Sequence, residues 1–158
     1  MKSKRNISWK VSVFALLFAV LAVISIGCAS ADTIYVPEEG NQTIQHAVNN
    51  ASEGDTIIVR DGTYTENVDV NVTHLTIQSE NGSASCTVDA LSSSDHVFEV
   101  TEDYVNISGF TATEASGKAG IYLGTGVDHC NISSNNANLN NTASTCILRA
   151  TTRSRATA

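Results

Sequence analysis

The sequence is poor in proline, in aromatic residues and in charge. Its 158 residues include 1 Pro, 6% aromatic and 16% charged residues, which disfavours a Pro-rich disordered chain and a helical enzyme with a conventional charged surface. Lys and Arg number 9 against 16 Asp and Glu, a net charge of −7, so the basic surface that a nucleic-acid binder needs is absent. Asn, Thr, Ser and Val are abundant instead, a mixture that favours extracellular β-structure.

The charge is distributed unevenly along the chain. All 16 acids lie between Asp32 and Asn141, where Arg60 and Lys118 are the only bases, so this part carries 2 − 16 = −14. The other bases lie near the two ends. An acidic surface of this kind attracts cations rather than polyanions.

Residues 1–31 have the three parts of a secretory signal peptide. Four bases fall within the first ten residues, an apolar run follows from Val11 to Ile26, and the small residues Ala29–Ala31 precede Asp32. The run of 16 residues is shorter than the roughly 20 that a membrane-spanning helix needs. We therefore expect a cleaved signal, a secreted or cell-surface protein, and membrane contact only through this segment. An uncleaved anchor and a lipid-modified Cys28 are the alternatives.

One helix is expected, near the start of the mature chain. After a short strand at Thr33–Val36, apolar residues recur with helical spacing from about Gln42 to Ala51, and Gly54 is expected to end the helix. His46 falls on its polar side, where solvation is expected.

The rest of the chain up to Asn141 is predicted to form short strands that recur in a degenerate sequence repeat. Ile77, Ile107 and Ile132 recur at intervals of 30 and 25 residues, each inside a similar motif that starts at His74, Tyr104 or His129. The dipeptide Asp61–Gly62 is read as a turn. The expected strands are Thr56–Val59, Val68–Val72, Leu75–Ile77, Val97–Val100, Tyr104–Ile107, Ile121–Leu123 and His129–Ile132.

This repeat predicts a solenoid, because a propeller blade needs four strands in roughly 40–45 residues. We expect an all-β fold, a right-handed parallel β-helix of which residues 32–141 form the N-terminal part. The one short helix would cap its first coil, since an open end exposes unpaired backbone and apolar side chains.

Two segments resemble a known group of proteins. Thr43–Ala51 (TIQHAVNNA) followed by Gly54–Val68 (GDTIIVRDGTYTENV) is similar to the N-terminal end of pectin-lyase-like right-handed β-helix proteins, and especially of archaeal cell-surface, surface-layer-type repeat proteins. That group shares its repeat with a copper-accessory protein and with carbohydrate-acting enzymes. The resemblance covers roughly Thr33–Asn141 and implies the fold rather than one function.

The repeat stops at Asn141. Residues 142–158 contain three Arg and no acid. A shift of one base in the reading frame allows Tyr-Gly-Ile-Tyr-Leu here, which is similar to Ala119–Leu123 one coil earlier. We expect a frameshift that truncated a longer repeat protein; a flexible basic tail is the alternative.

Carboxylates and histidines are the candidate reactive groups. The acid pairs are Asp55 with Asp61, Asp89 with Asp95, and Glu102 with Asp103, which we expect to be solvated turn acids rather than a catalytic pair. No cofactor is expected, although the oxygen-rich corners could hold calcium. His74, His96 and His129 are candidate metal ligands. His74 and His129 occupy matching repeat positions, so they could stack on one face. No Cys or carboxylate stands at the spacing that a metal site needs.

Cysteine and asparagine suggest two covalent possibilities. Cys86 and Cys130 are 44 residues apart and are either a disulfide, which export permits, or two free thiols. Seven Asn-x-Ser/Thr sequons follow residue 31, and Asn81 in a turn is the best glycosylation candidate, with Asn41, Asn50 and Asn71 next. Asn106 and Asn131 lie within strand motifs and are expected to be inward or stacked; the seventh is Asn140.

These observations favour a non-enzymatic, exported cell-surface or envelope module with a structural or interaction role. Its partners would be envelope glycans or other surface proteins, with no nucleic acid. The alternatives are a carbohydrate-binding or polysaccharide-cleaving β-helix whose site lies in missing downstream coils, and a copper-accessory relative.

Overall fold

A computed structural model describes residues 30–113 and 115–137. The chain divides into two compact units, Met1–Ser30 and Ala31–Ala158, and the description below concerns the second. Its described strands form three sheets in which every strand pair is parallel. The predicted signal segment, apart from its last two residues, and the predicted tail lie outside the described residues.

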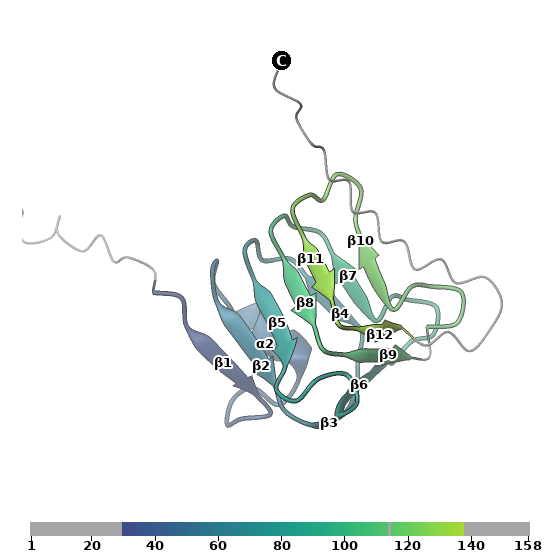
Figure 1. The fold of residues 1–158 in the computed structure, drawn as a ribbon, viewed down its shortest axis with the longest axis horizontal. Coiled ribbons are helices and arrows are strands. Elements are labelled where there is room, and N and C mark those ends of the chain that lie inside the picture. The colour runs from purple at the N-terminus through teal and green to yellow at the C-terminus, as the bar shows by residue number, and fades with distance from the viewer. Residues whose placement is uncertain (1–29, 114, 138–158) are drawn as a thin grey trace, which may run out of the picture. The chain divides into compact units, whose positions relative to one another are not determined.

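A sheet of five strands forms the first face of the molecule. Figure 1 shows these strands side by side, in an order in which neighbours are far apart in sequence. They are, in spatial order, β1 (Thr33–Val36), β2 (Thr56–Val59), β5 (Thr76–Ser79), β8 (Asn106–Ser108) and β11 (Asn131–Ser133).

A four-stranded and a three-stranded sheet complete the coils. The four-stranded sheet contains β3 (Gly62–Thr65), β6 (Cys86–Asp89), β9 (Thr111–Thr113) and β12 (Asn136–Ala137). The three-stranded sheet contains β4 (Val68–Val70), β7 (Phe98–Val100) and β10 (Ile121–Leu123). From β2 onward the chain visits the five-, four- and three-stranded sheets in turn, so each circuit lays one strand beside its counterpart of the previous coil.

Side chains stack in columns inside the coils. Strand pairing aligns Ile57 with Ile77, Ile107 and Ile132, and Ile34 of β1 precedes them. Because alternate residues of a strand point to opposite faces, this one register places five isoleucines inward. Three of them, Ile57, Ile77 and Ile107, are fully buried. Burial of apolar surface is the main favourable contribution to folding, so this column accounts for the repeat seen in the sequence.

The single described helix, α2 (Ile44–Asn50), covers one end of the interior. It packs beside β4, β1 and β2 and buries Ile44, Ala47 and Val48. The Thr43 side chain accepts a hydrogen bond from the His46 backbone N–H and so caps the first turn. With seven residues, α2 is too short to cross a bilayer, and no other helix that could do so occurs among the described residues.

The structure confirms the predicted fold class, a parallel β-helix with one short helix, and the predicted alignment of Ile77, Ile107 and Ile132. Two details of the helix prediction were wrong. The helix is shorter than Gln42–Ala51, and it ends at the extended residue Ala51 rather than at Gly54. Gly54, with a φ of 91°, instead forms the corner that leads into β2.

The four-stranded sheet was not predicted. Asp61–Gly62 was expected to be a turn, but Gly62 begins β3. The inward residues of this sheet include Tyr64, Val88, Ala112 and Ala137, which are aligned by strand pairing, and the fully buried Cys86. Two of them are alanines between short polar residues, so the sequence shows little of the apolar alternation that identifies a strand.

Candidate functional site

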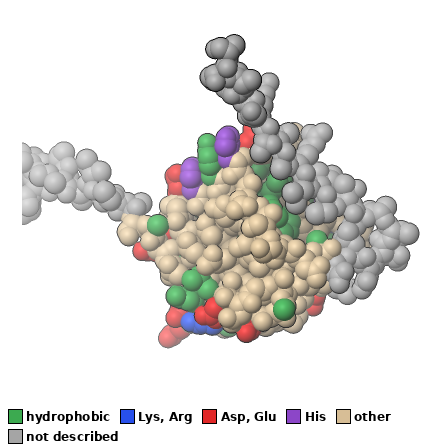
Figure 2. Space-filling model, viewed as in Figure 1, with side chains coloured by type: hydrophobic (Ala, Val, Ile, Leu, Met, Phe, Trp, Pro, Cys, Tyr) green, Lys and Arg blue, Asp and Glu red, His purple; other side chains and the backbone are tan. Residues whose placement is uncertain are grey.

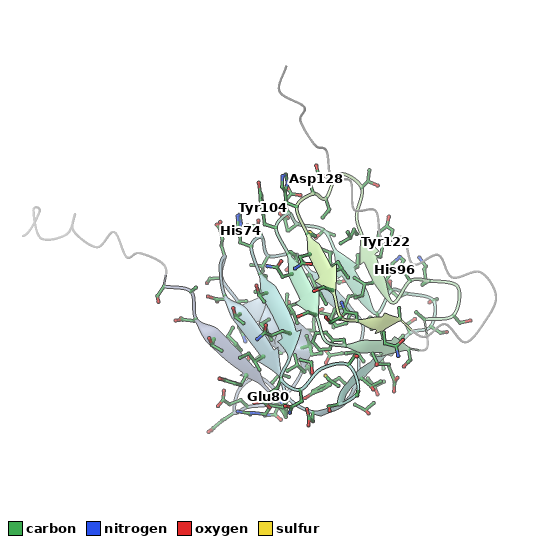
Figure 3. All side chains as sticks on the ribbon, viewed as in Figure 1. His74, Glu80, His96, Tyr104, Tyr122 and Asp128 are labelled. Carbon is green, nitrogen blue, oxygen red and sulfur yellow. The ribbon has the colours of Figure 1, made fainter. Side chains whose placement is uncertain are left out.

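Three stacked rings form a ladder at the corner that precedes the five-stranded sheet. The His74 and Tyr104 rings are 4.4 Å apart between centroids and 10° from parallel, and the Tyr104 and His129 rings are 4.7 Å apart and 16° from parallel. Figure 3 shows His74 and Tyr104 along one edge of the molecule. The expectation that His74 and His129 share one face is therefore confirmed, with Tyr104 between them. We call these three residues the ring ladder.

The backbone of each coil places these rings in register. His74, Tyr104 and His129 have φ values of 57°, 62° and 61°, in the left-handed region that non-glycine residues rarely adopt. The His74 and Tyr104 backbone N–H groups donate to the carbonyl oxygens of Asp103 and Asp128, one coil further on. The same corner is thus repeated in successive coils with the same backbone hydrogen bond. The side chains at this corner are therefore placed directly above one another and stack.

The ring ladder is exposed to solvent and has an acid beside it. Tyr104 is 42% exposed, which makes it one of the exposed large hydrophobic residues of the described chain. The His74 Nδ1 atom lies 3.2 Å from Oε1 of Glu53, a side chain that is itself 67% exposed. Figure 2 shows histidine and hydrophobic side chains next to one another along this rim. An exposed pair of this kind adds little to stability.

The ring ladder does not bring its two imidazoles to one metal ion. The whole tyrosine ring separates His74 from His129, whereas ligands of one ion lie about 2 Å from it. Among the residues that the structure describes, no group of three or more His, Cys, Asp or Glu side chains could hold a metal ion.

His96 belongs to a second stack. Its ring lies 4.3 Å from that of Tyr122, at 11°, and its Nδ1 accepts a hydrogen bond of 3.0 Å from the Ala119 backbone N–H. Nδ1 is therefore the acceptor nitrogen and Nε2 carries the proton of the neutral ring. This pairing could not be predicted, because Tyr122 does not share a motif position with His96.

Two carboxylates are buried and hold backbone amides. Oδ1 and Oδ2 of Asp55 accept from the backbone N–H groups of Asp32 and Ser52, both at 2.8 Å. The two oxygens of Glu66 accept from the N–H groups of Ile44 and Gln45, both at 2.9 Å. Glu66 thereby satisfies two donors of the first turn of α2 that have no partner within the helix. The sequence did not indicate this role, because the two ends of the contact are more than 20 residues apart.

Four other acids of the expected pairs also make structural contacts. Asp61 accepts from Nδ2 of Asn81 at 3.0 Å. Asp95 accepts from the backbone N–H of His96, and Asp103 from that of Asp128. Asp89 accepts from the Thr113 hydroxyl. Carboxylates used in this way fix corners and neighbouring coils to one another.

The two described cysteines are free thiols, so the disulfide alternative is not realised between them. Burial raises the pKa of the Cys86 thiol to about 11, and it also raises the pKa of Cys130. Since the thiolate is the reactive form, Cys86 is poorly suited to nucleophilic chemistry. Cys28 and Cys146 lie outside the described residues.

The predicted glycosylation residues differ in their surroundings. Asn71 and Asn81 are exposed, and Asn81 is bonded to Asp61. Asn41 and Asn50 bond to each other, Nδ2 of Asn50 donating to Oδ1 of Asn41 at 3.3 Å. Glycosylation of these four remains a prediction. Of the sequon residues in strands, Asn106 is stacked rather than inward and donates to the Thr76 hydroxyl at 3.2 Å, and Asn140 lies outside the described residues.

Comparison of the chain with protein-family models, with curated proteins and with solved structures finds no match. The fold is thus established by its own geometry. Function has to be argued from the surface of the coils.

Proposed function

We propose that this chain is an exported β-helix module of the cell envelope with a structural or interaction role, related to the pectin-lyase-like and archaeal surface-layer-type repeat proteins that it resembles. Three features support this proposal: the export-type segment at residues 1–31, the parallel coils and the acidic surface. A chain of stacked coils offers a long, regular surface and grows by the addition of equivalent units, which suits a building element.

The use of its carboxylates is the observation that carries this proposal. Asp55 and Glu66 are buried and bonded to backbone N–H groups, and Asp61, Asp95 and Asp103 also have hydrogen-bond partners. Most glycoside hydrolases use a pair of carboxylates that are free to exchange protons with a substrate. Acids that hold the coils together serve the architecture instead.

Export is the part of the proposal that can be tested most directly. We would produce the full chain in a host with a secretory pathway, fractionate the cells and measure the intact mass. The expected product starts at Asp32 and is found in the envelope or the medium. As a matched control, Leu17→Arg places a charge in the apolar run and should abolish export. A product that retains Met1 and stays inside the cell would contradict the proposal.

The structural role can be separated from enzyme activity with the same preparation. Incubation with polysaccharides, with and without calcium, should release no new reducing ends and no unsaturated products. Release of either would favour the cleaving alternative. Retention of one equivalent of copper by the purified chain, with a change in the histidine resonances, would favour the copper-accessory alternative.

A further inference from the structure

The cleavage point predicted for the export signal, between Ala31 and Asp32, adjoins a backbone nitrogen that contacts a buried carboxylate. Asp32 immediately precedes β1, the strand at one edge of the five-stranded sheet. Its carbonyl oxygen accepts from the Thr56 backbone N–H at 2.9 Å, and its own N–H donates to Oδ1 of Asp55 at 2.8 Å. Asp32 is thus held in the first coil through both of its backbone polar groups.

Asp55 occupies a position that apolar side chains fill in the next two coils. Asp55, Leu75 and Val105 each lie two residues before one of the aligned isoleucines of β2, β5 and β8. Because alternate residues of an extended chain point to the same side, all three are directed toward the interior. Leu75 and Val105 are fully buried, and Asp55 is only 5% exposed. A carboxylate at such a position is costly unless it is paired.

The donors to the two buried carboxylates differ in what happens to them during export. Oδ1 of Asp55 accepts from the N–H of Asp32, and Oδ2 from that of Ser52. The oxygens of Glu66 accept from the N–H groups of Ile44 and Gln45. Three of these four nitrogens belong to peptide bonds inside the mature chain and stay amides. The Asp32 nitrogen becomes an amine when residues 1–31 are removed.

We propose that removal of residues 1–31 creates an ion pair between the new α-ammonium group of Asp32 and the buried carboxylate of Asp55, which holds β1 against β2. A signal-cleaving protease hydrolyses the Ala31–Asp32 peptide bond with one water. The C–N bond breaks, the water oxygen joins the Ala31 carbonyl carbon to form a carboxylate, and both water protons end on the Asp32 nitrogen. This inference rests on the proposed function, because it requires the export signal to be cut after Ala31.

The ion pair strengthens a contact that is already in place. The uncut chain has a neutral N–H at this point, and the ammonium adds Coulomb attraction that is screened less at a partly buried site than in open water. Asp32 itself is exposed, so the other hydrogens of the ammonium group remain hydrated. The precursor therefore holds β1 less firmly than the mature chain does, and cleavage completes the first coil.

Acetylation of the α-amine of the exported chain tests this proposal. The full chain is produced in a secretory host, and the intact mass of the purified product identifies its first residue. Lys118 is the only lysine after residue 31, so a product that starts at Asp32 has two primary amines. The folded product is treated at pH 7 with the N-hydroxysuccinimide ester of acetic acid, and peptide mass mapping follows the two amines separately.

An insertion variant supplies the reference rate. Gly-Ser inserted between Ala31 and Asp32 moves the new α-amine two residues away, while Asp32 keeps its amide and Asp55 its carboxylate. The parent α-amine should react at least about tenfold more slowly than that of the insertion variant, because a nearby opposite charge shifts the amine toward the unreactive ammonium form by one pH unit or more. The parent should also unfold at a higher denaturant concentration at pH 7.

Paired substitutions assign the slow reaction to one carboxylate. Asp55→Asn removes the charge beside the amine and should raise the rate to within about twofold of the insertion variant. The matched control, Glu66→Gln, removes the charge of the other buried carboxylate and should leave the parent rate changed by less than about twofold. Circular dichroism checks folding. If Asp55→Asn does not fold, the parent and the insertion variant, which both retain Asp55, still decide the question.

The outcomes separate this inference from the proposed function. A folded, exported product that starts at Asp32 and is acetylated as fast as the insertion variant would overturn the ion pair and leave the envelope role standing. An exported product that starts at another residue would do the same. A chain that keeps Met1 and stays inside the cell would refute both, and the intact mass with the cell fractionation identifies that case.

Discussion

Two columns of stacked side chains run along the same coils, one inside and one outside. The inner column consists of isoleucines from the five-stranded sheet, of which Ile57, Ile77 and Ile107 have no exposed surface. The outer column is the ring ladder, His74, Tyr104 and His129, at a corner with positive φ values. Both repeat once per coil. The inner column gains from apolar burial, whereas the outer one offsets backbone strain with ring contacts that remain partly in water.

This difference explains which column contributes more to the stability of the fold. Burial of an isoleucine side chain contributes about 1.5–3 kcal/mol relative to exposure. A residue in the left-handed region costs about 1–2 kcal/mol, and an aromatic pair returns about 0.5–1.5 kcal/mol. The inner column is therefore a large net gain. The ring ladder is a net cost, because its three left-handed residues cost about 3–6 kcal/mol and its two ring pairs return about 1–3 kcal/mol.

The largest expected effect follows from breaking the inner column in its middle. Ile77→Ala should lower the free energy of unfolding by about 2–5 kcal/mol, because it leaves a cavity between two coils. Ile132→Ala is the matched substitution at a position that is only partly buried and should cost less than half as much. Denaturant unfolding followed by circular dichroism measures both. Equal losses at the two positions would contradict the expectation that the stability contribution of each isoleucine increases with its burial.

An intermediate effect is expected at the centre of the ring ladder. Tyr104→Ala removes the stacking and keeps a Cβ at a φ of 62°, so we expect a loss of about 1 kcal/mol. Tyr104→Gly removes the same stacking and relieves the strained backbone. The glycine variant should therefore unfold at a higher denaturant concentration than the alanine variant. The reverse order would mean that stacking does not oppose strain at this corner.

The two columns also differ in how far they could be predicted. The spacing of Ile77, Ile107 and Ile132 revealed the inner column, because β-branched apolar residues that recur at a fixed interval are typical of stacked coils. The position of His74 and His129 on one face followed from their matching motif positions. The left-handed corner itself was not predicted: Tyr104 and His129 were expected to start strands, and rings in that conformation carry no sequence signal comparable to glycine.

Contacts between coils account for most of what the sequence did not reveal. Most strands of the four-stranded sheet have small inward residues such as Ala112, so little apolar alternation marks them. Glu66 satisfies the helix N–H groups of Ile44 and Gln45 from more than 20 residues away. Neither fact follows from a local pattern, because both depend on which residues the coil register brings opposite one another.

The smallest expected effect concerns a thiol inside the coils. Burial raises the pKa of Cys86 to about 11, above the value of about 8.5 of an unfolded chain. The native state therefore keeps a proton that the unfolded state releases between these values, and stability should fall as the pH rises through this window. Tyr64 has a raised pKa for the same reason, so the slope is best read below pH 10, where its ionisation contributes less.

A comparison with Cys86→Ala isolates this contribution. The variant is less stable at pH 8 because it loses buried volume, but its unfolding midpoint should fall less steeply between pH 8 and pH 10 than that of the parent chain. Alkylation mapped by peptide mass provides an independent reading, since the partly exposed Cys130 should react well before Cys86 at pH 8. Parallel slopes in the two proteins, together with equal alkylation rates, would mean that Cys86 ionises as freely as a surface thiol and that the inner side of β6 is open to water.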